Sequence, residues 1–227
     1  MMVVAWMIGY ENGYSWSSDP EKQFHYHPTL MIISMLFITG EALVVFRVLR
    51  KETKRRTKLI HVILHTITLL FIMISLKAVW DSHRYHRDSF GKLDPLPNLY
   101  SLHSWIGIAL VTIYFGQYVT GFVSFFYPAF NNTIRAILMP FHRLIGHFIF
   151  LFVGLTILMG ITEFSAWHHK CWTDDKTFCA EQGLANCIGI VTLLYIGLIL
   201  LIAMNPRWQR KELPEEGLLQ DTENSDY

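Results

Sequence analysis

The chain has 227 residues, a mean hydropathy of +0.31 and a formal net charge of +1. Hydrophobic residues make up 52% of it and charged residues 16%, which is too apolar for an ordinary water-soluble domain of this length. The small net charge gives no support from bulk electrostatics for nucleic-acid binding, so no nucleic-acid partner is expected. The composition predicts an all-α integral membrane bundle surrounded by lipid.

Five apolar stretches are each long enough to cross a bilayer, which takes about 20 residues. In chain order they are 25–46, 59–80, 99–126, 138–163 and 184–204. A sixth apolar segment, 1–10, is too short to span. Residues 1–211 are therefore expected to form one transmembrane domain, and the acidic, polar residues 212–227 are expected to form a disordered cytosolic tail.

Lysine and arginine are distributed unevenly between the two predicted membrane faces. The segment 47–58 alone carries seven, and its face carries eleven in total against six on the opposite face. Because positively charged loops favour the cytosolic side, this face and the C-terminus are predicted to be cytosolic. Cys171 and Cys179 then share one non-cytosolic loop, where a disulfide and two free thiols are both open interpretations.

Four histidines inside the predicted spans form a regular pattern. His27 and His103 lie just inside the non-cytosolic ends of the first and third spans. His61 and His142 lie just inside the cytosolic ends of the second and fourth. Since the spans alternate in direction, each pair lies at one depth. Two imidazoles on neighbouring helices are suitable axial ligands for a haem, so the pattern predicts two b-type haems, one near each face.

The competing interpretation of these histidines is a path for metal ions, because imidazole also binds zinc and copper. Each depth offers only two ligands, whereas a zinc site usually has more. His65, four residues after His61, is an alternative ligand for the same haem, although a role in supporting His61 or packing beside it is favoured, and His25 is expected to be solvated. Four more histidines on the non-cytosolic side could bind a metal substrate: His83, His86, His168 and His169.

Charged residues also lie close to the predicted ligands. Four basic ones flank the cytosolic pair: Lys54, Lys58, Arg135 and Arg143. They could neutralise haem propionates or attract an anionic reductant, although the positive-inside rule accounts for much of 47–58. Glu163 closes the fourth span near the other face, where it could hydrogen-bond groups of the second haem or mark the water interface.

Around these residues the sequence resembles the transmembrane cytochrome b561 family of ascorbate-dependent reductases. The matching stretches are 24–28 (FHYHP), 43–47 (LVVFR), 58–61 (KLIH), 98–105 (NLYSLHSW), 138–142 (LMPFH) and 205–210 (NPRWQR). The resemblance covers about 11–211 and implies six helices, with a four-helix haem-binding core at 24–163. The first family helix would be represented only by 1–10, as in a truncated isoform or an incomplete gene model.

The resemblance implies electron transfer from cytosolic ascorbate through two haem b groups to monodehydroascorbate or ferric iron on the other face. It implies the same pairs, His27 with His103 and His61 with His142, and a homodimer. It implies these further roles: ascorbate near Lys54, Lys58 and Arg135, a haem propionate at Arg47, the acceptor at His83, and the non-cytosolic haem lined by Asn98, Leu99, Tyr100, Ser101 and Glu163. Gln209 departs from the lysine of some members.

The residues by themselves leave two other functions open. The chain could be the haem-bearing membrane anchor of a quinone-linked redox complex, or a histidine-lined metal transporter. Secretory vesicle, endolysosomal and plasma membranes all fit the composition.

Overall fold

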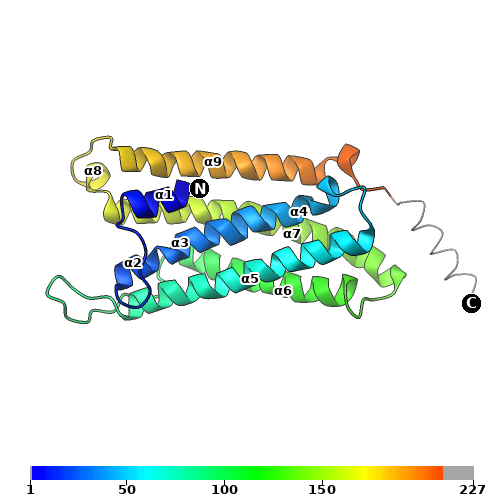
Figure 1. Cartoon of the computed structure of the whole chain (residues 1–227), viewed down its shortest axis with the longest axis horizontal. Helices are drawn as coiled ribbons and strands as arrows, with labels where there is room; N and C mark the ends of the chain where they lie inside the picture. Colours follow the sequence, from blue (N-terminus) through cyan, green and yellow to red (C-terminus); the bar gives the residue numbers. More distant parts are fainter. Residues whose placement is uncertain (1, 212–227) are drawn as a thin grey trace, which may run out of the picture.

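The computed structural model describes residues 2–211, and the predicted disordered tail lies outside them. The helices are α1 (Met2–Gly9), α2 (Pro20–Phe24), α3 (Tyr26–Met31), the π-helix η1 (Ile32–Ile38), α4 (Thr39–Val48), α5 (Lys54–Arg84), α6 (Leu102–Phe125), α7 (Asn132–His168), α8 (Lys170–Thr173), α9 (Ala180–Met204) and the 3-10 helix η2 (Pro206–Trp208). They run lengthwise in one elongated bundle (Figure 1). Within 2–211 no β-strand forms, so the prediction of an all-α bundle is confirmed.

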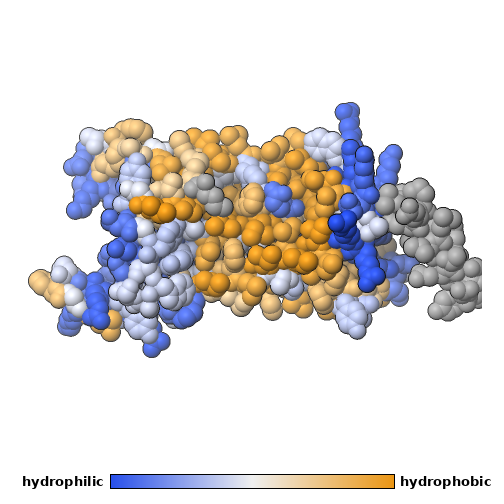
Figure 2. All heavy atoms as spheres, viewed as in Figure 1, coloured by the Kyte–Doolittle hydropathy of each residue, from blue (hydrophilic) through white to orange (hydrophobic). Residues whose placement is uncertain are grey.

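Five helical segments are long and apolar enough to cross a membrane, as predicted. The first, Pro20–Val48, is composite, because α2, α3, η1 and α4 follow one another with only His25 between α2 and α3. The others are α5, α6, α7 and α9. On the face that Figure 2 shows, apolar residues cover the middle of the bundle and hydrophilic residues gather at both ends, as expected for a protein that spans a bilayer.

The helix ends differ from the predicted span ends because caps, not apolarity, set them. α7 begins at Asn132 rather than at 138, since the side chain of Asn131 accepts a hydrogen bond from the backbone N–H of Ile134. Arg135, predicted in a loop, is therefore in the first turn of α7. α6 begins at Leu102 rather than at 99, where Ser101 forms a capping box with Ser104.

A buried cluster in the middle of the bundle joins the first four spans. Its members are Met35, Ile72, Leu110, Tyr114, Ile149 and Val153. They come from η1, α5, α6 and α7. This layer separates the two ends of the bundle, and each end contains a cavity.

The short α1 packs at one end of the bundle, beside α7 and α9 (Figure 1). Trp6 and Met7 are buried there against Phe164 and Ile188. A disulfide between Cys171 and Cys179 lies at the same end. The disulfide, one of the two interpretations left open by the sequence, is thus present. We refer to this end as the disulfide end and to the end that carries 47–58 as the basic end.

Candidate haem sites

The four histidines come together in the two pairs that the sequence predicts. The ring centroids of His27 (α3) and His103 (α6) are 6.1 Å apart, and those of His61 (α5) and His142 (α7) are 6.4 Å apart. An imidazole nitrogen binds a metal at about 2.0 Å, and a ring centroid lies about 1 Å behind its nitrogen, so one metal between two rings needs a centroid separation of about 6 Å. Both pairs match that spacing.

Hydrogen bonds fix the orientation of three of these rings. Nδ1 of His61 donates to the carbonyl oxygen of Ala42 at 2.8 Å, and Nδ1 of His103 donates to that of Thr156 at 2.9 Å. A carbonyl can only accept, so the proton is on Nδ1 and the lone pair on Nε2 is left for a metal.

The ring of His27 is held in the same tautomer by Ser75. The Ser75 hydroxyl donates its proton to the His27 carbonyl oxygen at 3.2 Å. The hydroxyl oxygen therefore accepts from Nδ1 of the His27 ring at 3.1 Å. Outer hydrogen bonds of this kind are the usual support of metal-binding histidines.

Two glycines make room for the histidines between α6 and α7. A Cβ on Gly121 of α6 would lie 2.8 Å from Cε1 of His142, and a Cβ on Gly160 of α7 would lie 2.8 Å from Cε1 of His103. Both glycines lie eighteen residues after the histidine of their own helix. Eighteen residues are five full helical turns, so each helix presents its histidine and its glycine on one face.

A third and fourth glycine extend this pattern, which the sequence analysis missed. Gly107 follows His103 by four residues and Gly146 follows His142 by four, and each glycine lines the cavity of that histidine. The repeated spacing could have been found in the sequence as an internal repeat of α6 and α7. It leaves a flat, side-chain-free wall next to each ring, which suits a planar ligand.

The cavity at the basic end, here called the basic cavity, contains His61, His65 and His142 and has a volume of about 460 Å³. Five cationic side chains line it: Arg47, Lys54, Lys58, Arg143 and Arg210. Within the described residues that line it no carboxylate is present. The cavity thus attracts anions.

Arg47 and Lys58 both line the basic cavity. One guanidinium nitrogen of Arg47, Nη2, donates to the carbonyl oxygen of Ala203 at 2.6 Å, whereas Nη1 is buried without a hydrogen-bond partner. Nζ of Lys58 donates to the carbonyl oxygen of Phe125 at 2.9 Å. A buried guanidinium N–H without a partner is costly, and an anionic group in the cavity would satisfy it.

Arg135 and Gln209 also lie at the basic end. Arg135 does not line the cavity itself, but it is close enough to Lys58 to repel its charge. Its side chain hydrogen-bonds Asn132. Gln209 lines the cavity at the position where some relatives are expected to have lysine.

The cavity at the disulfide end, here called the apolar cavity, has about the same volume, 450 Å³, and contains His27 and His103. Its lining includes all the residues expected there: His83, Asn98, Leu99, Tyr100, Ser101 and Glu163. Glu163 is the one Asp, Glu, Lys or Arg side chain among the described residues that line it. Most of its wall is apolar and aromatic.

The polar groups of the apolar cavity are linked to one another. Nδ1 of His83 and Oδ1 of Asn98 are 2.9 Å apart, and the Ser101 hydroxyl donates to Oε2 of Glu163 at 3.2 Å. Burial and the nearby negative charge of Glu163 raise the pKa of Tyr100. Glu163 is therefore part of the cavity wall and not only a marker of the membrane surface.

Comparison with known proteins agrees with this arrangement. The family model for eukaryotic cytochrome b561 matches residues 26–168. The chain is 48% identical over 216 residues to the Caenorhabditis elegans homologue of the transmembrane ascorbate-dependent reductase CYB561, which covers 95% of this chain and 81% of that protein. The chain belongs to the cytochrome b561 family.

Other relatives match over similar lengths. Human transmembrane ascorbate-dependent reductase CYB561 is 38% identical over 218 residues, 96% of this chain and 82% of that protein. The Xenopus laevis plasma membrane ascorbate-dependent reductase CYBRD1 is 34% identical over 220 residues, 96% of this chain and 74% of that protein. The resemblance read from the sequence motifs is thereby confirmed.

Cytochromes of this family bind haem b, and the residues present here fit that group. Each cavity has two imidazoles at metal-bridging separation, glycines that clear a flat wall and an apolar lining. At the basic end the orphaned nitrogen of Arg47 is a suitable partner for a propionate. At the disulfide end the polar side chains of Asn98, Tyr100 and Ser101 are suitable hydrogen-bond partners for a propionate.

Two other histidines of this cytochrome b561, His65 and His25, are also turned into the protein. Nδ1 of His65 is 2.5 Å from the hydroxyl oxygen of Tyr114, and its ring centroid is 4.4 Å from that of His61, so His65 packs beside His61 as expected. His25, expected to be solvated, is 5% exposed. Its ring is turned inward, where Nδ1 hydrogen-bonds the Gly13 carbonyl oxygen at 2.5 Å; that prediction was wrong because the 10–19 loop covers the helix start.

Proposed function

We propose that this cytochrome b561 carries electrons across a membrane, from ascorbate at the basic end to an acceptor at the disulfide end, with one haem b in each cavity. The observation that carries this proposal is the pairing of two histidine cavities of similar size and opposite position, of which only one is strongly cationic. Haem iron held by two imidazoles takes up and gives up one electron without a vacant coordination position.

The basic cavity is the proposed donor side. Ascorbate is an anion at neutral pH, and positive charge is supplied by Lys58, which lines the cavity, and by Arg135 beside it. Lys54 lines the same cavity. These side chains would bind and orient the anion, which loses one electron and one proton to become monodehydroascorbate, with the proton released to water at that face. The names of the relatives as ascorbate-dependent reductases support this donor.

The apolar cavity is the proposed acceptor side. His83 lies in the last turn of α5 and is partly exposed, and its ring is stacked at 6.4 Å from that of Phe24. An imidazole near the surface can bind ferric iron or hydrogen-bond monodehydroascorbate, the two acceptors that we expect. Glu163 would add a negative charge that favours a cationic acceptor over an anionic one.

The layer between the cavities is the proposed electron path. Tyr114 and Ile149 line the basic cavity, while Leu110 and Val153 line the apolar one, and all four belong to the same buried cluster. The side chains of the cluster are buried and, apart from the Tyr114 hydroxyl, apolar, so the cluster would keep water and protons from following the electron. Its role is to hold the two ligand pairs at a fixed separation.

The charge distribution of the loops supports one orientation in the membrane. We place the basic end in the cytosol, because 47–58 carries seven lysines and arginines. The disulfide end would then face a secretory, endolysosomal or extracellular space, where the Cys171–Cys179 bond is chemically stable. A homodimer, which the resemblance implies, stays a prediction.

The test is a vesicle assay with the full chain in its haem-bound form. Vesicles loaded with ascorbate would be placed in a solution of ferric citrate, and ferrous iron outside would be measured with a membrane-impermeant chelator. We expect ferrous iron to appear only with the protein present, and His61→Ala to reduce the rate to that of protein-free vesicles. A wild-type rate no higher than that of protein-free vesicles would overturn the proposal.

A further inference from the structure

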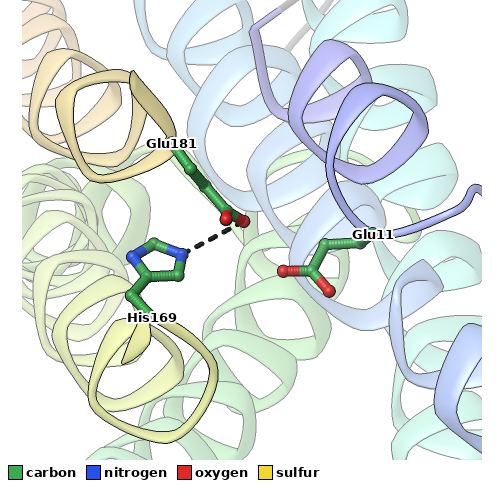
Figure 3. A group of neighbouring side chains, drawn as sticks. All are labelled: Glu11, His169 and Glu181. Carbon is green, nitrogen blue, oxygen red and sulfur yellow. Dashed lines mark ion pairs between the residues drawn. The ribbon is translucent and has the colours of Figure 1, made fainter. Parts of the chain in front are cut away.

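A group of potential metal ligands lies outside both cavities, at the disulfide end. Glu11 follows α1, His169 joins α7 to α8, and Glu181 lies in the first turn of α9. One potential ligand atom of each lies within 4.8 Å of those of the other two. Figure 3 shows the three side chains converging from three separate segments. The fold thus brings together residues that are 158 and 12 positions apart.

The tautomer of His169 is set by a chain of hydrogen bonds. Nε2 of Gln182 donates to Oδ1 of Asn186 at 3.0 Å, which places the Gln182 amide oxygen toward His169. That oxygen accepts from Nδ1 of His169 at 2.6 Å. When the ring is neutral, its Nε2 therefore carries a lone pair and no proton. The residue is only 2% exposed, and its Nε2 has no hydrogen-bond partner.

This unpartnered nitrogen points at a carboxylate. Nε2 of His169 is 3.2 Å from Oε1 of Glu181, although the two atoms are not aligned for a hydrogen bond. With a neutral ring the two atoms are both acceptors, and at this distance they repel each other unless a cation or a proton lies between them. Ligands about 2.0–2.2 Å from a tetrahedral zinc ion are about 3.4 Å from each other, which is close to the observed distance.

Glu11 adds a second carboxylate to the same point. A carboxylate oxygen of Glu11 lies within 4.8 Å of the ligand atoms of both His169 and Glu181. Both carboxylates are partly buried, and two carboxylates this close repel each other unless a cation or a shared proton lies between them. Trp6 also contributes, since its Nε1 donates to Oε1 of Glu181 at 2.8 Å, and such support is typical of metal-binding carboxylates.

We propose that Glu11, His169 and Glu181 bind one divalent transition-metal cation of the zinc type. One imidazole and two carboxylates suit such a cation, with water as the remaining ligand. The bound ion would tie the chain after α1 to α8 and α9. Because Trp6 also lines the apolar cavity, the ion would hold one wall of that cavity in place.

This proposal does not depend on electron transfer or on its direction. The cluster shares no residue with the four haem-ligand candidates, and His83, the expected acceptor residue, is not part of it. A cation site here would be present in a protein that never received an electron. Its test therefore uses metal binding, not reductase activity.

The test is equilibrium dialysis of the detergent-purified, haem-bound protein against Zn²⁺ after treatment with a chelator, with bound metal measured by mass spectrometry. Glu11→Gln and Glu181→Gln keep the size and hydrogen-bonding capacity of the side chains and remove the charge. Asp175→Asn, an exposed carboxylate in the loop between α8 and α9, is the matched control. The haem absorption spectrum verifies that each variant is folded.

We expect the wild type and Asp175→Asn to bind one Zn²⁺ ion with equal affinity. Each glutamine variant should bind this ion about 100-fold more weakly or worse, because loss of a residue that only supports a metal ligand already weakens binding 10–100-fold. Equal Zn²⁺ binding in all four proteins would overturn the proposal, as would a wild type that binds no Zn²⁺. If the glutamine variants lose their haem spectrum, X-ray absorption at the zinc edge of the wild type decides. One imidazole with oxygen ligands supports the site, and several imidazoles or a sulfur ligand contradict it.

Discussion

The two cavities are alike in how they hold a pair of histidines and unlike in charge. In each, the two rings are about 6 Å apart, glycine on the facing helix clears space for one ring, and the volume is about 450 to 460 Å³. The basic cavity has five cationic side chains in its wall, whereas the apolar cavity has one carboxylate, Glu163.

The shared features and the difference in charge correspond to two aspects of the proposed function, cofactor binding and the choice of reactant. The shared features, histidines and glycines at matched helix positions, are what a planar bis-imidazole cofactor needs at either end. The charged side chains differ because the two ends would meet different reactants, an anionic donor at one and a cationic or radical acceptor at the other. Variants that damage the shared features should therefore affect either cavity, and variants that remove charge should affect only one.

The largest expected effect comes from removing a ligand. His61→Ala or His142→Ala should leave about one haem per chain. Reduction by ascorbate should be abolished, because the haem beside the ascorbate site is the one that is lost. His27→Ala or His103→Ala should also leave about one haem, but that haem should still be reduced by ascorbate. Haem content by pyridine haemochrome and optical spectra with ascorbate measure both. Equal behaviour of the two pairs toward ascorbate would contradict the proposed direction.

A smaller effect is expected from filling the space beside a ring. Gly121→Ala should displace His142, and Gly160→Ala should displace His103, since the new Cβ would lie 2.8 Å from a ring carbon. Overpacking of this kind costs about 1–3 kcal/mol, so haem should be partly lost from one cavity in each variant. Gly116→Ala, where nothing lies within 4 Å, is the control. Full haem occupancy in both variants would show that the rings have room to move.

A change of charge should affect the basic cavity alone. Lys58→Ala should raise the KM for ascorbate by about tenfold or more, because a hydrogen bond to a charged group contributes about 1.5–3 kcal/mol, and should leave haem content unchanged. Arg55→Ala removes an exposed positive charge from the same segment and should have much less effect. The rate of reduction by ascorbate, measured at several concentrations, distinguishes them. Equal KM values for the two variants would place the donor elsewhere.

The smallest expected effect concerns the support of one ligand. Ser75→Ala removes the acceptor of the His27 Nδ1 proton, which makes the imidazole a weaker donor to the iron. One hydrogen bond contributes about 1 kcal/mol, or roughly 40 mV for one electron, so one midpoint potential should rise by that amount. Ser82→Ala, another buried serine of α5, should change neither potential. A redox titration followed optically measures this.

Much of the fold could be predicted from the sequence because a bilayer imposes a simple rule. The five spans and the two histidine pairs follow from apolar length and from the alternation of direction. The helix ends did not follow, since Asn131 and Ser101 set them through side-chain hydrogen bonds. The π-helix Ile32–Ile38 has no evident signal in its apolar sequence.

The candidate sites were predicted less completely. The glycine spacing in α6 and α7 was present in the sequence but had no meaning until Gly121 and Gly160 were seen against the rings. The burial of His25 depends on the loop that covers it, and Glu11 meets Glu181 only through the packing of α1 on α9. Contacts between segments so far apart in the chain cannot be read from one sequence.

The measurement that tests the central claim most directly is the optical spectrum of the detergent-purified full chain, oxidised and then after addition of ascorbate, together with its haem content. The proposed function predicts two haem b per chain, both reduced by ascorbate. One haem or none in a folded chain supplied with haem, or two haems that ascorbate does not reduce, would contradict it.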